Sequence, residues 1–112
     1  MRSTAAFLSD ARDHARRAAD YVLYVDSNSF ASDTMRKDAV CFCLLIVGEA
    51  CREASKSVSH LANDVPWEQI NGMRNILVHE FWQIDKDIVY NVARTEARPL
   101  ADRLDGLIQT LS

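Results

Sequence analysis

Apolar residues recur at alternating spacings of three and four over much of the chain, the period of helices that bury one face. The first such run predicts a helix over about residues 4–25, with Leu8, Ala11, Ala15, Ala18, Val22 and Val25 as its buried seam. Residues 26–33, DSNSFASD, are rich in turn and cap formers and lack a regular period. We therefore expect a loop there, with Ser32 or Asp33 capping the next helix.

A second helix is expected over about residues 34–57. It is apolar nearly all round between Ala39 and Val47, which indicates the central element of a bundle. Gly48 interrupts this segment and costs about 1 kcal/mol in helix propensity relative to alanine. Close approach of a neighbouring helix would explain that glycine.

Two further helices complete the pattern. One is expected from Pro66 to Phe81, because proline suits a first turn. Its predicted buried stripe is Trp67, Ile70, Met73, Leu77 and Phe81. The last begins after a staple-and-cap signal at Ile84 and Asp85 and continues through Leu111. Pro99 should kink or divide it.

The composition agrees with an all-α fold. The 112 residues include only three glycines and two prolines, and 48% are hydrophobic. A chain of this length fits a single domain with one core. The sequence thus predicts one domain over residues 1–112, a four- to five-helix up-down bundle with a kinked last helix.

Charge limits the ways in which the chain meets a nucleic acid. Thirteen basic and sixteen acidic residues give a net charge of -3, so the molecule lacks a strong overall basic field. Any nucleic-acid contact must be local. The polar face of the first helix mixes both signs, which indicates a solvated surface, with a basic RNA-binding stripe as the functional alternative.

The cysteines and the apolar runs point to a cytoplasmic protein. Cys41, Cys43 and Cys51 form no C-x-x-C pair and read as reduced core thiols. The N-terminus lacks the sustained apolar segment of a signal peptide. The longest apolar run, residues 39–47, is far shorter than the roughly 20 residues that cross a membrane.

Arg74 and His79 stand out within GMRNILVHEFW, residues 72–82. Five residues apart on an ideal helix, they lie roughly 140° around the axis from each other and about 7.5 Å along it. Their heads meet only if the helix unwinds near His79, if the arginine reaches around, or if a second copy supplies the missing partner across a twofold axis. Asn75, four residues before His79, shares its face.

Such a cluster can cleave RNA without a metal ion. An imidazole can move the proton of the 2′-hydroxyl or of the leaving oxygen, while a guanidinium holds the charge that builds on the phosphate. DNA lacks the 2′-hydroxyl. In the structural alternative Arg74 pairs with Glu68 or Glu80, and a carbonyl satisfies His79. The histidines have no metal-ligand spacing, so neither a metal nor a cofactor is expected.

Glu49 interrupts the apolar central helix and has two interpretations. It orients Arg74 as a supporting carboxylate, or it reaches solvent and pairs with Arg52 or Arg36.

The arginine, a polar residue directly after it and a histidine four to six residues later resemble the signature of the HEPN superfamily, matched by Arg74, Asn75 and His79. Within that superfamily, IVGEA at 46–50 and PWEQINGMRNILVHEFWQID at 66–85 are similar to the HepT branch. The similarity spans nearly the whole chain.

This resemblance implies a HEPN-like homodimer in which two arginine–histidine pairs face a shared cleft. It implies a metal-independent endoribonuclease toxin, encoded beside a minimal nucleotidyltransferase that serves as antitoxin. Arg74 and His79 would be catalytic, Asn75 their polar helper, and Glu49 a supporting residue in the family's GEA block. The alternatives are a noncatalytic HEPN module that binds RNA, a nucleotide or the nucleotidyltransferase, and a purely structural dimerisation domain.

The chain departs from the branch at one position. Characterised members carry a tyrosine two residues after the histidine, and the partner can silence the toxin by attaching AMP to its hydroxyl. This chain has Phe81 there, which offers no oxygen. The hypothesis that follows is neutralisation by binding alone or by modification elsewhere.

Overall fold

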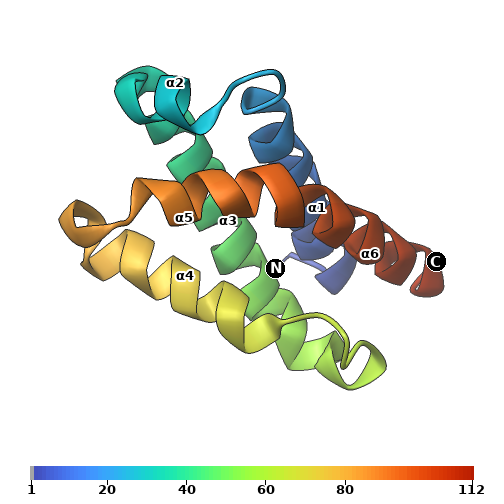
Figure 1. The fold of residues 1–112 in the computed structure, drawn as a ribbon. Coiled ribbons are helices and arrows are strands. Elements are labelled where there is room, and N and C mark those ends of the chain that lie inside the picture. Colours follow the sequence, from blue (N-terminus) through green and yellow to red (C-terminus); the bar gives the residue numbers. More distant parts are fainter. Residues whose placement is uncertain (1) are drawn as a thin grey trace.

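Helix α3 (Thr34–Val58) runs through the centre of the molecule and carries most of the other elements (Figure 1). The computed structural model describes residues 2–112, and within them all regular structure is helical. The remaining elements are α1 (Thr4–Tyr21), α2 (Ser27–Ser32), η1 (Ser59–Leu61), α4 (Trp67–His79), η2 (Phe81–Gln83), α5 (Lys86–Asn91), η3 (Val92–Glu96) and α6 (Ala97–Thr110). The predicted all-α bundle is confirmed.

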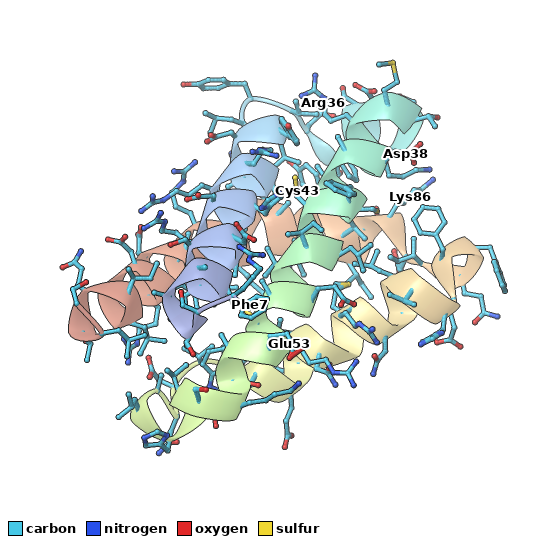
Figure 2. All side chains as sticks on the ribbon, turned by 180° about the vertical axis from the view of Figure 1, so that it is seen from behind. Phe7, Arg36, Asp38, Cys43, Glu53 and Lys86 are labelled. Atoms are coloured by element: carbon cyan, nitrogen blue, oxygen red, sulfur yellow. The ribbon has the colours of Figure 1, made fainter. Side chains whose placement is uncertain are left out.

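The predicted central helix is confirmed with nearly the expected bounds. Asp33 caps it, since the Asp33 carboxylate accepts a hydrogen bond from the Arg36 N–H at 3.0 Å. Figure 2 shows α3 between α1 on one side and α4 on the other. Helix α6 packs on α1 rather than on α4. Helix α4 is therefore held mainly by α3.

Two clusters of buried residues make up the core. One joins α1, the second half of α3 and α6, around Leu8, Cys51 and Leu104. The other joins the first half of α3 to α2, α5 and the end of α4, around Phe30 and Val89. All three cysteines are buried and unpaired, as the sequence predicts.

The chain between α1 and α3 differs from the expectation. Helix α1 ends at Tyr21 rather than near residue 25, and Tyr24 adopts a positive φ of 63° that no helix continues through. The expected loop contains α2, which Asp26 caps through the Ser29 N–H at 2.8 Å. Phe30 stabilises this short helix because its side chain is fully buried.

Helix α4 is shorter at both ends than predicted. Pro66 lies at the cap position just before it, and Glu80 leaves the helical region after His79. Leu77 is buried, and Trp67, Ile70 and Met73 are half-buried. Placing Phe81 in the buried stripe was wrong, because the chain turns into η2 there and leaves the Phe81 ring 46% exposed.

The last helix is divided, as Pro99 predicts. Asp85 caps α5, accepting from the Asp87 N–H at 2.8 Å. Segment η3 is a π-helical turn in which the Ala97 N–H donates to the carbonyl of Val92. Thr95, within this turn, carries the carbonyl that would clash with the ring of Pro99 in a regular helix. None of the helices within residues 2–112 is long and apolar enough to span a membrane.

Candidate active site

Arg74 is seated where α4 comes closest to α3. The nearest point on α3 is Gly48, where a Cβ atom would overlap the Cβ of Arg74 and lie 3.3 Å from its Cα. The expected close approach at this glycine is thus confirmed, and the neighbouring helix is α4. The Arg74 side chain is only 16% exposed, since its stem lies against α3.

Two side chains hold the Arg74 guanidinium. Its Nε donates to Glu49 Oε1, and its Nη1 donates to Asn75 Oδ1 at 2.9 Å. Of the two interpretations of Glu49, the structure places this carboxylate on Arg74 rather than on Arg52 or Arg36. The structural alternative, an ion pair of Arg74 with Glu68 or Glu80, is not observed, since Arg74 pairs with Glu49. Glu49 is 46% exposed, so the pair lies at the boundary between the helix interface and solvent.

His79 is the last residue of α4, and its side chain is exposed. The structural alternative, a partly buried histidine satisfied by a carbonyl, does not fit this exposure. Asn75 and His79, four residues apart within α4, share one face of that helix. Because Nη1 of Arg74 reaches Asn75, the guanidinium is turned around the helix toward this face.

Of the three routes by which the two heads can converge, the contact with Asn75 fits the arginine that reaches around. The structure brings Arg74, Asn75 and Glu49 into direct contact. His79 joins them only by sharing the Asn75 face, and no hydrogen bond among residues 2–112 links it to the other three.

Sequence reasoning did not connect two residues of this region, Gly48 and Asn71, with Arg74. Gly48 was noticed as a packing position, but its contact with Arg74 depends on the register of two helices and has no local signal. The side chain of Asn71, one turn before Arg74 and Asn75, has a buried Oδ1 that lacks a hydrogen-bond partner in the described chain. Its polar side chain at this spacing was the only available signal.

Other groups in the described chain offer less chemistry. Burial raises the pKa of Cys41 to about 11 and that of Cys51 to about 12, so neither thiol is a nucleophile near neutral pH. No group of three metal-ligating side chains gathers within residues 2–112. The Nδ1 of His14 lies 2.8 Å from the carbonyl of Asp10.

Several charged residues on the mixed face of α1 form ion pairs. Arg12 donates to Asp105 of α6 at 2.8 Å, and Arg98 of α6 donates to Asp20 of α1 at 2.7 Å. These pairs fit the solvated-surface interpretation better than a basic RNA-binding stripe.

Comparison with known proteins identifies a ribonuclease family. The family described as Ribonuclease HepT-like matches residues 11–107. A candidate RNase of Methanocaldococcus jannaschii, MJ1380, is 30% identical over 95 residues, which cover 85% of this chain and 87% of the relative. A second one from that organism, MJ0125, is 26% identical over 110 residues, 98% of this chain and 95% of the relative.

A candidate ribonuclease HepT of Thermococcus cleftensis is 22% identical over 106 residues, 95% of this chain and 96% of the relative. No solved structure matches the chain. The family match covers most of the helical core and includes both Glu49 and the Arg74–His79 segment. The chain belongs to the HepT-like ribonuclease family.

Proposed function

We propose that this protein is a metal-independent endoribonuclease in which His79 is the general acid/base and Arg74 stabilises the transition state. Asn75 and Glu49 support Arg74. One observation carries the proposal. Glu49 and Asn75 hydrogen-bond the Arg74 guanidinium and turn it toward the face of α4 that Asn75 shares with the exposed His79.

The proposed reaction uses the 2′-hydroxyl of RNA as nucleophile. The 2′-oxygen forms a bond to phosphorus as its proton leaves, and the bond from phosphorus to the 5′-oxygen breaks. That leaving oxygen takes up a proton, which gives a cyclic 2′,3′-phosphate and a free 5′-hydroxyl. His79 transfers protons in these steps. Arg74 donates hydrogen bonds to the non-bridging oxygens, which gain negative charge in the transition state.

The test is purified protein incubated with RNA in EDTA. We expect cleavage of RNA but not of the matching DNA, with cyclic phosphate ends. His79→Ala should lower kcat by about 10²–10⁴-fold, the usual contribution of general acid–base catalysis. Arg74→Ala should lower it by about 10²–10³-fold, as for loss of a donor to developing charge.

His60→Ala is the matched control, because His60 is exposed and lies on η1 outside the proposed site. It should cut RNA like the unaltered protein. Full activity in either Arg74→Ala or His79→Ala would refute the assignment. Tight RNA binding without products, in the unaltered protein, would instead support the noncatalytic HEPN module.

We also propose that the active form is a homodimer whose interface covers the exposed apolar residues around Arg74. Phe42 lies on α3 seven residues before Glu49, on the same face, and is 55% exposed. Val78, next to His79, is 43% exposed, and Trp82 is 81% exposed. Large exposed apolar side chains gathered at one site are typical of an interaction surface. A second copy would enclose the site and bring a second Arg74–His79 pair near the first.

Light scattering at micromolar concentration should give the mass of a dimer. Phe42→Glu should shift it to a monomer and lower cleavage, because a charge there would be desolvated in the interface. Leu111→Glu is the control, since Leu111 is similarly exposed but lies at the end of α6. A monomeric mass for the unaltered protein would contradict the dimer.

Finally, we propose that the protein acts in the cytoplasm as the toxin of a toxin–antitoxin pair, with a minimal nucleotidyltransferase as antitoxin. The family membership supports this role. Three unpaired buried thiols suit a reducing compartment. Co-expression with the neighbouring nucleotidyltransferase should relieve growth inhibition that the protein alone causes.

A further inference from the structure

The backbone conformation of Gly48 does not require a glycine. Gly48 lies inside α3, and no glycine within residues 2–112 has a positive φ. At such a position alanine is favoured over glycine by roughly 1 kcal/mol. The conformation of Gly48 therefore offers no reason for its presence in the longest helix of the molecule.

The space around Gly48 offers that reason. A Cβ atom there would overlap Arg74 Cβ and lie 2.9 Å from Arg74 Cγ. It would also lie 3.3 Å from Arg74 Cα. These atoms belong to the backbone and the root of the side chain, so they cannot swing away as the tip of a long side chain does. Any larger residue at position 48 must push α4 off α3 at Arg74.

Glu49, the next residue along α3, makes the contact between Gly48 and Arg74 matter for the guanidinium. Glu49 accepts the hydrogen bond from Arg74 Nε. Two consecutive residues of α3 therefore contact Arg74: Gly48 packs against its Cα and Cβ, and Glu49 binds its guanidinium. Hydrogen bonds weaken steeply with added distance and poor angles. If α4 moves outward at Arg74, the Nε–Glu49 bond lengthens and the guanidinium is free to turn.

We infer that Gly48 is a positioning residue for Arg74: its missing side chain sets the α3–α4 separation at which Glu49 holds Arg74 Nε. With Nε on Glu49 and one Nη1 hydrogen on Asn75, the other Nη1 hydrogen and both Nη2 hydrogens remain as donors for a phosphate. The catalytic consequence rests on the ribonuclease function proposed above. The placement of the guanidinium does not.

The test compares Gly48→Ala with Gly72→Ala. Gly72 lies in α4, two residues before Arg74, and a Cβ atom there would meet nothing within 4 Å. Both changes gain the same intrinsic helix propensity. Only Gly48→Ala introduces the overlap, so differences between the two variants report the contact with Arg74.

The first measurement is the side-chain Nε–H resonance of Arg74 in a ¹⁵N–¹H spectrum, identified by its loss in Arg74→Lys. We expect Gly72→Ala to leave its position and its hydrogen exchange unchanged. In Gly48→Ala it should move to the position found in Glu49→Ala, where the acceptor is gone. An unmoved resonance in a folded Gly48→Ala would overturn the inference.

The second measurement covers the case in which Gly48→Ala does not fold. Because the overlap is with Arg74 Cβ, Arg74→Gly removes it. Gly48→Ala combined with Arg74→Gly should unfold at a higher temperature than Gly48→Ala alone, whereas Arg74→Gly should lower the unfolding temperature of Gly72→Ala. Equal effects of Arg74→Gly in both backgrounds would overturn the steric coupling.

The third measurement is RNA cleavage. Gly48→Ala should lower kcat about 100-fold with a smaller change in KM, as expected when a group that acts in the transition state is displaced by about 1 Å. Gly72→Ala should stay within about twofold of the unaltered protein, because its added Cβ meets nothing within 4 Å and a change without new contacts has a small effect. Equal kcat for the two variants, with a moved resonance, would overturn the catalytic consequence. If the unaltered protein cuts no RNA, the proposed function is wrong. The Arg74 Nε–H resonance then still tests whether Gly48 positions the guanidinium.

Discussion

Arg74 combines a buried stem with a head that must reach a substrate. A buried guanidinium is unfavourable unless it is paired and hydrogen-bonded, and Glu49 and Asn75 meet that requirement. Since Glu49 is itself 46% exposed, the pairing occurs at the rim of the helix interface rather than inside it. The stem packs against α3 while the charge stays within reach of water and of a phosphate.

Phe81 bears on how the proposed antitoxin would neutralise the protein. Its ring is 46% exposed at the start of η2, two residues beyond His79, so it is accessible but has no oxygen that could accept a nucleotidyl group. The hydroxyl of Tyr90, another conceivable acceptor, donates to the carbonyl of Val25. For the proposed toxin–antitoxin pair, the hypothesis of neutralisation by binding agrees with a Phe81 that has no oxygen and a Tyr90 hydroxyl that is already hydrogen-bonded.

We predict that the protein co-expressed with its neighbouring nucleotidyltransferase carries no AMP, as measured by intact-mass spectrometry. Phe81→Tyr under the same conditions should gain one AMP, because it supplies the missing hydroxyl on an exposed ring. An AMP adduct on the unaltered protein, at Tyr90 or Tyr24 for example, would contradict neutralisation by binding alone.

Long periodic helices were predictable from the sequence, and short or irregular ones were not. The bounds of α3 and its Asp33 cap follow from local pattern. Helix α2 was missed because six residues are too few to show a period, and burial of Phe30 against the Tyr90 ring, 5.4 Å between centroids, stabilises it instead. Tertiary packing outweighed the local turn signal.

The residues of the candidate site were predictable from the sequence, but their arrangement was not. Arg74, Asn75, His79 and Glu49 could be selected because charge or polarity interrupts apolar helices. Their arrangement could not, because the contact of Gly48 with Arg74 requires the register between α3 and α4. Nothing in either segment alone specifies that register.

The π turn in η3 leads to a prediction about how α5 and α6 are connected. Such a turn adds one residue, so removing it would rotate α5 against α6 by about 100°. Both sides are anchored by buried residues, Val89 before it and Ala97 and Leu104 after it. Exposing one such valine or leucine costs about 1.5–3 kcal/mol, more than the roughly 1 kcal/mol that one regained backbone hydrogen bond contributes.

We therefore predict that Pro99→Ala keeps the π turn although the proline clash is gone. A crystal structure of the variant should still show the Ala97 N–H on the carbonyl of Val92. A bond from Ala97 to Ala93, the regular α-helical partner, would mean that Pro99 alone imposes the irregularity.

At the scale of the whole molecule, arginine–aspartate pairs link elements of the bundle and engage part of its positive charge. Arg12 and Arg98 link α1 with α6, and Arg103 of α6 binds Asp64 after η1 at 2.8 Å. With a net charge of -3 there is little surplus positive charge for nonspecific attraction of RNA. In the proposed ribonuclease, capture of RNA would depend on contacts close to Arg74.

These pairs also predict how stability depends on pH. The hydrogen bonds from Arg12 and Arg103 hold the pKa values of Asp105 and Asp64 below their ordinary value. The backbone N–H of Arg36 does the same for the pKa of Asp33. When the folded pKa is lower than the unfolded one, the unfolded chain binds more protons at intermediate pH. The contribution is complete above the ordinary carboxyl pKa of about 4 and is lost as the pH falls through the lowered values.

Urea unfolding from pH 7 down to pH 3 should therefore show a free energy of unfolding that drops below about pH 4, the ordinary carboxyl range. Asp105→Asn should flatten this drop. Asp38→Asn, at an exposed carboxylate of α3 without an ion pair among residues 2–112, is the control and should leave the slope unchanged. A slope that Asp105→Asn does not alter would show that its pairing with Arg12 contributes nothing.

Helix α4 touches the rest of the bundle along one seam, and beyond its other flank lies an apolar groove of about 320 Å³ that reaches to Leu100 of α6. A segment held mainly by one neighbouring helix opens at a lower free energy than the whole molecule unfolds. On gentle warming, such a protein would lose catalysis before it loses its circular dichroism, and cooling would restore both. Heat inactivation would then measure the stability of the packing of α4 on α3 rather than the unfolding of the whole domain.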